Sequence, residues 1–463
     1  MRGSIHSLKS RIAGIPAPAE PQPRTIPFGA PLLAVGALVF ALALWACVEA
    51  SQAWGYAWNG GDLYIYFLGA HSVEDHSDVL YSAGFGPLEL PFIYPPFAAL
   101  TFSWIVPDDF MDLKEAMSIV TIACTFIVCW IAWGMLGYRR TIGRLGAALA
   151  TAGVCLWLVP VNRSLQFGQI NMLLLTFIVA DVATPDRRRW KGVGIGLATA
   201  IKLTPGLFVV YLLLTRRFRA AGVAIGTFLA TVVFAWFFLP GASKTYWTNV
   251  SEIGSRVNNE IPLYALDNQT LKGFSLRLFD GGFPGGPVAF LLAAAVVVLG
   301  LASAVIVSQR GHELAAATLV GLVGLLMSPL SWSHHYVWAV PALVLLLHWA
   351  FTRRTIGVWA ALIVFAVVFA SIPMARPDYG PLPDKTVPLG LLWLAPDTDP
   401  LGFGPAEFFF GNSLVFVGSL AVVVAAIWSW RSIKPALSAR SSRPAAPEDT
   451  AAQQPEPRAA GRI

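Results

Sequence analysis

Residues 30–50 read APLLAVGALVFALALWACVEA, and this stretch decides the class of fold. It is long enough to cross a bilayer as one helix, because about 20 predominantly apolar residues span the hydrocarbon core. The 463-residue chain is 56% hydrophobic and only 13% charged, whereas soluble domains average roughly 25% charged residues. The sequence therefore predicts a protein that crosses a membrane several times.

Further apolar runs follow along the chain, and we predict an all-α bundle with about ten spanning helices. The predicted spans are residues 30–50, 116–137, 145–160, 169–182, 219–240, 287–308, 314–329, 336–352, 355–373 and 412–430. Two further apolar segments, 94–106 and 192–214, have charged flanks and are predicted to enter the membrane and return on the same side. The chain thus divides into a tail (1–29), a membrane domain (30–430) and a second tail (431–463), whose composition predicts disorder.

If both short segments return, every cluster of basic residues falls on one side of the membrane. These clusters are the first tail, Arg139/Arg140/Arg144, residues 187–189, residues 216–219, Arg310, Arg353/Arg354 and the chain from Arg431 onward. The positive-inside rule then places this side, with both termini, in the cytoplasm of a multi-pass cell-membrane protein. The net charge of +6 reflects these segments and needs no nucleic-acid partner.

Asp62 is an isolated acid on the opposite, extracytoplasmic side. It lies in GGDLY (60–64), about a dozen residues beyond the first span, with no Lys or Arg close in sequence. An unpaired carboxylate at the water edge of a membrane can accept a proton, and partial burial can tune its pKa. The alternative is an aspartate that caps a helix. We take Asp62 as the candidate catalytic residue.

Lys202 lies in the middle of the apolar segment 192–214. A lysine at membrane depth is costly unless it is paired, so it usually marks a functional site, although a snorkelling structural lysine is the alternative. His334 and His335 lie in SWSHH (331–335), where one predicted span ends and the next begins. Both histidines can face an anion at such a helix start.

The segment NRSLQFGQIN (162–171) places six polar residues between two predicted spans, where we expect a short loop at 161–168. Its arginine suits an anion site, so we group Arg163 with Lys202, His334 and His335 as candidate phosphate ligands. The ring of Tyr94, in YPPF (94–97) at a predicted helix start, can stack on a sugar. The candidate substrate-binding residues are Tyr94, Gln166, Gln169, Asn171, Asn268 and Arg277.

The four cysteines lie in apolar runs and lack metal-ligand spacing. They are interpreted as small core residues. We therefore predict neither a bound metal nor a cofactor.

Taken in order, five motifs resemble those of glycosyltransferase family 87, whose members have the GT-C fold. The motifs are GGDLY (60–64), YPPF (94–97), QFGQIN (166–171), GLATAIKLTPGL (196–207) and SPLSWSHH (328–335). The resemblance implies a GT-C-like bundle and an α-1,2-mannosyltransferase that uses a polyprenyl-phosphate-mannose donor. It also implies that Asp62 is the catalytic base and that Lys202, His334 and His335 lie near the donor phosphate.

The implied acceptor is a cell-envelope glycolipid or lipoglycan of the phosphatidylinositol mannoside, lipomannan or lipoarabinomannan type. A donor anchored in the bilayer needs no nucleotide-binding domain, and the sequence contains no motif for one. The alternative within the family is an arabinofuranosyltransferase that uses the corresponding arabinose lipid. A lipid or sugar transporter is the alternative from another class, but the predicted spans carry almost no charge and show no internal repeat.

Overall fold

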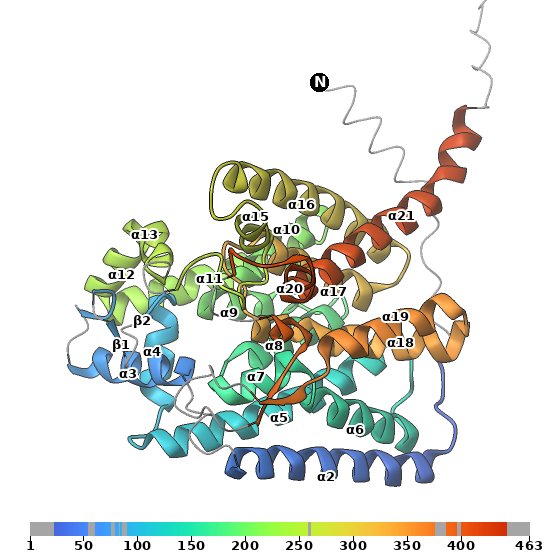
Figure 1. Ribbon diagram of the computed structural model, residues 1–463, viewed down its shortest axis with the longest axis horizontal. Helices are drawn as coiled ribbons and strands as arrows, with labels where there is room; N and C mark the ends of the chain where they lie inside the picture. The colour runs from blue at the N-terminus through green and yellow to red at the C-terminus, as the bar shows by residue number, and fades with distance from the viewer. Residues whose placement is uncertain are drawn as a thin grey trace, which may run out of the picture.

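The structure is a computed structural model of the chain. It describes residues 23–53, 61–75, 79–82, 84–85, 90–257, 261–375, 386–395 and 400–441. Most of the first predicted tail (1–29) and most of the second (431–463) lie outside these residues. The described chain is a bundle of helices with two short antiparallel ribbons, as Figure 1 shows.

Among the described residues, six helical segments are long and apolar enough to cross a membrane. They are α2 (Gly29–Ala53), α5 (Phe110–Met135), α11 (Phe218–Phe238), α16 (Gly285–Gln309), η4 with α18 (Ser333–Trp338 and Ala339–Arg353) and α21 (Ser413–Ser441). The shorter apolar helices are α4 (Pro96–Ile105), α6 (Ile142–Leu156), α8 (Asn171–Ala183), α10 (Leu207–Leu214) with its preceding turn, α17 (Glu313–Met327) and α19 (Ile356–Phe369). Every predicted span falls on one of these helices. The all-α membrane class is therefore confirmed, whereas the total of about ten crossings stays a prediction.

The remaining elements are short and lie mainly in the connections. The helices are α3 (Gly61–Asp75), α7 (Val159–Phe167), α9 (Val193–Ile201), η3 (Thr204–Gly206), α12 (Pro240–Thr248), α13 (Val250–Ser255), α15 (Leu271–Leu278), η5 (Leu391–Leu394) and α20 (Pro405–Gly411). Strand β1 (Gly84–Phe85) pairs with β2 (Leu90–Pro91), and β3 (Ile372–Ala375) pairs with β4 (Thr386–Leu389).

The outer surface of the bundle is apolar. Leu38 on α2 and Phe290 on α16, for example, are 59% and 74% exposed. An apolar surface of this extent is unfavourable in water and suits contact with lipid. Small residues bring α2 and α6 into backbone contact, because a Cβ on Gly146 would lie 2.6 Å from the Leu32 carbonyl oxygen. One face of α2 therefore packs closely against α6, and its exposed apolar face suits contact with lipid.

The apolar segment 192–214 folds back on itself. Helix α9 and helix α10 are separated by Lys202 and η3, and Gly192 at the start of α9 lies against Ala220 at the start of α11. Asp186 joins the two flanks, with its carboxylate 3.0 Å from Lys191 and 3.3 Å from Arg217. The two ends of the segment thus lie together, and Lys202 lies at the turn between them.

Two local expectations have different outcomes. Helix α4 begins at Pro96, as the YPPF motif predicts, since proline is favoured in the first helical turn. The predicted loop at 161–168 is wrong, because these residues belong to helix α7. Pro160 lies in its first turn, and Gly168 ends it in the left-handed conformation (φ 64°) that glycine adopts without strain. The regular spacing of the helix fixes the directions of the polar side chains in this segment.

Candidate active site

Six of the predicted site residues meet where α3, the start of α8, the turn at Lys202 and η4 come together. These residues are Asp62, Gln169, Asn171, Lys202, His334 and His335. They come from four segments that are far apart in sequence. The fold therefore unites the isolated acid, the membrane-depth lysine and the histidine pair.

Asp62 lies in the first turn of α3 with its side chain 28% exposed. Next to it, Leu63 packs against Gly168, where a Cβ would lie 2.6 Å from the Leu63 Cβ, so only glycine allows this approach. Burial raises the pKa of Asp62 from its ordinary value of 3.8, while a hydrogen bond from Gln169 and the charge of Lys202 offset part of this effect. The carboxylate is thus partly shielded and still reachable, as a proton acceptor must be.

His334 is buried beside this acid. Its Nε2 lies 3.9 Å from an Asp62 carboxylate oxygen, and its ring packs against Phe167 at 5.3 Å between centroids. Neither ring nitrogen of His334 has a hydrogen-bond partner among the described residues. Since buried polar atoms are normally paired, the two nitrogens are available to a substrate. The backbone carbonyl of His334 accepts hydrogen bonds from Asn171 and Ser164, which fixes the turn.

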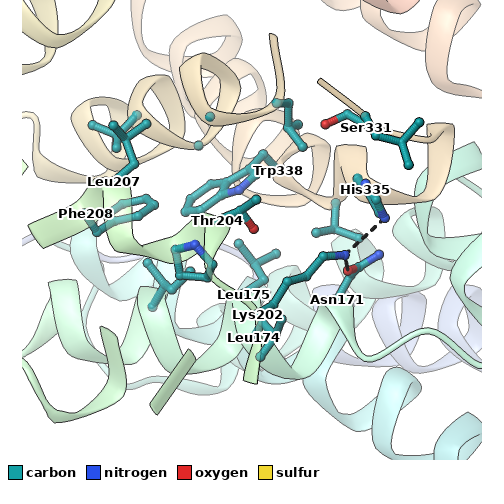
Figure 2. A pocket seen from close by; sticks show the side chains of 18 residues that line it. Asn171, Leu174, Leu175, Lys202, Thr204, Leu207, Phe208, Ser331, His335 and Trp338 are labelled. Carbon is teal, nitrogen blue, oxygen red and sulfur yellow. Dashed lines mark hydrogen bonds between the residues drawn. The ribbon is translucent and has the colours of Figure 1, made fainter. Parts of the chain in front are cut away.

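Lys202 and His335 form a second contact, shown in Figure 2. Lys202 Nζ lies 3.1 Å from His335 Nε2 and 3.4 Å from Asn171 Oδ1. The backbone N–H of Trp332 donates to His335 Nδ1, so a neutral ring carries its proton on Nε2. An ammonium group and an N–H group then face one another. Two donors converging in this way favour an anionic oxygen that contacts both of them.

An apolar cleft opens from this pair of donors. Its empty space, including the open mouth, measures about 630 Å³. Lys202, His335 and Asn171 form its polar end, and the rest of the lining is mainly apolar, including Leu174, Leu175, Phe208 and Trp338 (Figure 2). The walls come from α8, α10, α17 and η4. This shape suits a molecule with an anionic group attached to a hydrocarbon chain.

Arg163 lies nearby with its charge already paired. Its guanidinium lies 3.7 Å from the Asp267 carboxylate and donates to Gln166 Oε1 at 3.1 Å. Gln166 in turn donates to Asn162, so both ends of its amide are occupied within α7. The positive charge of Arg163 therefore influences the site at a distance, because it interacts electrostatically with both Asp62 and His334. Gln166 helps to hold the Arg163 side chain in place.

Asp267 is a functional candidate that sequence reasoning missed. Besides pairing with Arg163, its carboxylate accepts a hydrogen bond from the backbone N–H of Ser333 at 3.0 Å. Burial raises the pKa of Asp267, and the charge of Arg163 opposes this effect. The acid directly precedes the amide-rich segment at 268–269, and this position is the only signal that the sequence offers for it.

Tyr66 is a second missed residue, one helical turn after Asp62 on α3. Its hydroxyl donates to Gln169 Oε1 at 2.9 Å and lies 2.8 Å from the hydroxyl of Tyr94. Since Gln169 Oε1 is occupied, its amide nitrogen can face Asp62. Tyr94 thus lies at the site, with its ring centroid 5.8 Å from Lys202 Nζ. The spacing of four residues from Asp62 could have identified Tyr66.

Asn268 and Arg277 lie outside this cluster and hold the surrounding loops. The Asn268 side chain accepts from Ser331 N–H and donates to two backbone carbonyls. Arg277 donates to Asn412 and to the backbone carbonyls of residues 264, 265 and 268. Asn268 therefore holds the chain at Ser331, and Arg277 holds the loop at residues 264–268 to Asn412. In the described part of the chain, no cluster of three or more His, Cys, Asp or Glu side chains could hold a metal.

Comparison with known proteins places this site in a family. A sequence profile described as "Glycosyltransferase family 87" matches residues 92–329. A Mycobacterium tuberculosis protein named polyprenol-phosphate-mannose-dependent alpha-(1-2)-phosphatidylinositol pentamannoside mannosyltransferase is 34% identical over 312 residues, covering 65% of this chain and 70% of the relative. Its namesake in Mycolicibacterium smegmatis is 30% identical, covering 65% and 73%.

A third relative, also from Mycobacterium tuberculosis, is named polyprenol-phosphate-mannose-dependent alpha-(1-2)-phosphatidylinositol mannoside mannosyltransferase. It is 32% identical over 317 residues, covering 64% of this chain and 72% of its own length. No solved structure matches the chain significantly. The profile and these relatives, with the motifs that meet at Asp62, Lys202 and His335, show that the chain is a glycosyltransferase and belongs to glycosyltransferase family 87.

Proposed function

We propose that this chain transfers a mannosyl residue from a polyprenyl-phosphate donor to a glycolipid or lipoglycan acceptor of the phosphatidylinositol mannoside, lipomannan or lipoarabinomannan type. The observation that carries the proposal is the pair of converging donors, Lys202 and His335, at the polar end of an apolar cleft. The names of the matched relatives, which specify polyprenol-phosphate-mannose and phosphatidylinositol mannosides, support the choice of donor and acceptor.

The polar end and the apolar walls of the cleft define how the donor lies in it. One oxygen of the donor phosphate contacts both Lys202 Nζ and His335 Nε2, so the anion satisfies both groups. The first isoprene units lie along the apolar walls, which would otherwise expose hydrocarbon surface. The sugar then points toward Asp62 and His334, since these residues lie beside the same pair.

Asp62 acts as the general base in an inverting transfer. It takes the proton of the acceptor hydroxyl as that oxygen forms a bond to the anomeric carbon. The bond between the anomeric carbon and the phosphate oxygen breaks on the opposite face, and the electron pair leaves with the polyprenyl phosphate. Lys202 and His335 contact the charge that builds on the leaving phosphate, and the field of Arg163 adds to their effect.

The first experiment compares donors. The full chain, reconstituted in vesicles with a phosphatidylinositol mannoside acceptor, is given either polyprenyl-phosphate mannose or polyprenyl-phosphate arabinose. We expect a mannosylated product with an α-1,2 linkage and no transfer of arabinose. Transfer of arabinose alone would instead support the arabinofuranosyltransferase. Movement of intact lipid across the vesicle without transfer would support a transporter.

We place the catalytic domain at residues 30–430, with the site on the extracytoplasmic face and both tails in the cytoplasm. The positive-inside rule supports this orientation, and so does the joining of the two basic flanks of segment 192–214 through Asp186. Figure 1 is consistent with it, since α2 begins and α21 ends toward the side of the bundle opposite α3 and α4.

Cysteine labelling tests the orientation. We expect Arg216→Cys to react with a membrane-impermeant maleimide only after permeabilisation, because residue 216 then lies in the cytoplasm. Lys244→Cys, exposed on α12, is the matched control and should react in intact cells. The four native cysteines are buried and give little background. Labelling of residue 216 in intact cells would contradict both the hairpin and the orientation.

A further inference from the structure

A second cavity lies at the other end of the bundle. It is bounded by the chain at Arg24, the end of α5, the turn between α16 and α17, and the last turns of α18. Figure 1 shows the end of α18 at the opposite side of the bundle from α3 and α4. Its empty space, including the open mouth, measures about 1120 Å³, compared with about 630 Å³ for the cleft at Lys202. No residue of the candidate active site lines it.

The charge around this cavity is positive and unbalanced. Arg24, Arg310 and Arg353 line it, and none of them forms a salt bridge within the described residues. Glu313 also lines the cavity, but its carboxylate is held by the guanidinium of Arg217. In the part of the chain that the structure describes, these three cations have no local counter-charge, and this favours an anionic ligand.

The hydrogen-bond donors of Arg310 and Arg353 are only partly used, whereas Arg24 Nη1 lies 3.0 Å from His348 Nε2. Arg310 donates to the Ser432 carbonyl at 2.6 Å, while its Nε is buried without a hydrogen-bond partner among the described residues. Arg353 stacks on Trp349 at 5.3 Å from the ring centroid, a contact that leaves its N–H groups available. Burial together with the charges of Arg353 and Arg310 lowers the pKa of His312, which leaves the imidazole neutral in a positive field.

The rest of the lining is apolar. Met135, Leu136, Leu314, Leu345 and Trp349 form walls beside the cationic groups. These apolar walls would not stabilise a free inorganic ion. A lipid, in contrast, places its phosphate on the arginines and its acyl chain against the apolar side chains. The position supports the same ligand, since the basic clusters of the sequence mark this end as the one that meets the anionic cytoplasmic leaflet.

We propose that this cavity binds the phosphate group of an anionic phospholipid from the leaflet at that end of the bundle. It is a binding site separate from the donor phosphate site at Lys202. By joining the ends of α5, α16, α17 and α18, the bound lipid stabilises the helical bundle.

The test uses the full chain in detergent micelles and measures its thermal unfolding midpoint as a ligand is added. The three ligands are phosphatidylglycerol, phosphatidylcholine and inorganic phosphate. We expect phosphatidylglycerol alone to raise the midpoint, since a ligand that binds the folded state stabilises it. An equal effect of inorganic phosphate would assign the site to a soluble phosphate. An equal effect of phosphatidylcholine would overturn the proposal.

Variants locate the effect. The double substitution Arg310→Gln and Arg353→Gln should require at least about fivefold more phosphatidylglycerol for half the stabilisation, because two charge-assisted contacts are lost. Arg140→Gln with Arg187→Gln, two basic residues predicted on the same side but outside the cavity, is the matched control and should respond like the parent. Lys202→Ala should also keep the response, which separates this site from the donor site.

An equal response of the two double variants would overturn the proposal. If the double variant fails to fold, Arg353→Gln alone is measured, because Arg353 is exposed and its loss leaves no buried charge unpaired. An unchanged response of that variant would likewise contradict the site.

Discussion

Asp62→Asn should reduce the turnover of mannosyl transfer by about 100-fold or more, with the donor still bound. Asparagine keeps the size of the side chain and one acceptor oxygen, but it cannot take the proton of the acceptor hydroxyl. The measurement is the initial rate at saturating donor and acceptor, together with the KM for the donor. Because the Asp62 side chain is partly exposed and asparagine keeps its size, the variant should fold, so this loss would be chemical.

Asp109→Asn is the matched control. Asp109 caps α5 by accepting hydrogen bonds from the backbone N–H groups of Met111 and Asp112. Asparagine serves equally well at a helix N-cap, so this variant should keep nearly full activity. If Asp62→Asn also keeps near-normal activity in a well-folded protein, Asp62 is a cap and the assignment as base is wrong.

The dependence of kcat/KM on pH tests the role of Asp62 independently. A general base is active only when it is ionised, so kcat/KM should fall as the pH drops through the pKa of Asp62. Burial raises that pKa above 3.8, so the acid limb should lie at higher pH than for a solvent-exposed aspartate. The Asn variant should lose this limb, and an unchanged limb in its residual activity would point to another group such as Asp267.

Lys202→Ala should lower kcat/KM for the donor by about tenfold to a hundredfold and leave the KM for the acceptor unchanged. The reason is the loss of a charge-assisted contact with the donor phosphate, which is worth roughly 1.5–3 kcal/mol. The measurement is the rate as a function of donor concentration at fixed acceptor. Lys244→Ala, an exposed lysine on α12, is the control and should behave like the parent.

His335→Ala completes a double-mutant cycle with Lys202→Ala. Since His335 Nε2 and Lys202 Nζ lie 3.1 Å apart and are proposed to contact one phosphate, the two losses should not add. Fully additive effects on donor use would show that the two groups act separately. An unchanged dependence of the rate on donor concentration in both variants would exclude the proposed phosphate site.

The sequence alone determined the membrane class, the position of each main helix and the most unusual polar residues. These features are local. A bilayer demands a long apolar run for each crossing and makes a buried lysine costly. The sequence alone therefore identifies the apolar runs at 30–50 and 287–308 and the isolated Lys202. The ordered motifs added the family, which the profile match over residues 92–329 confirms.

Only the tertiary structure decided which polar residues act together. Arg163 is paired by Asp267, 104 positions away in the chain, and Lys202 meets His335 across 133 positions. Asn268 and Arg277 look like ligands in the sequence, yet their groups bond to backbone carbonyls and Asn412. Such partnerships depend on how helices pack, which the apolar pattern of each helix does not specify, because a run that faces lipid and one that faces another helix have the same composition.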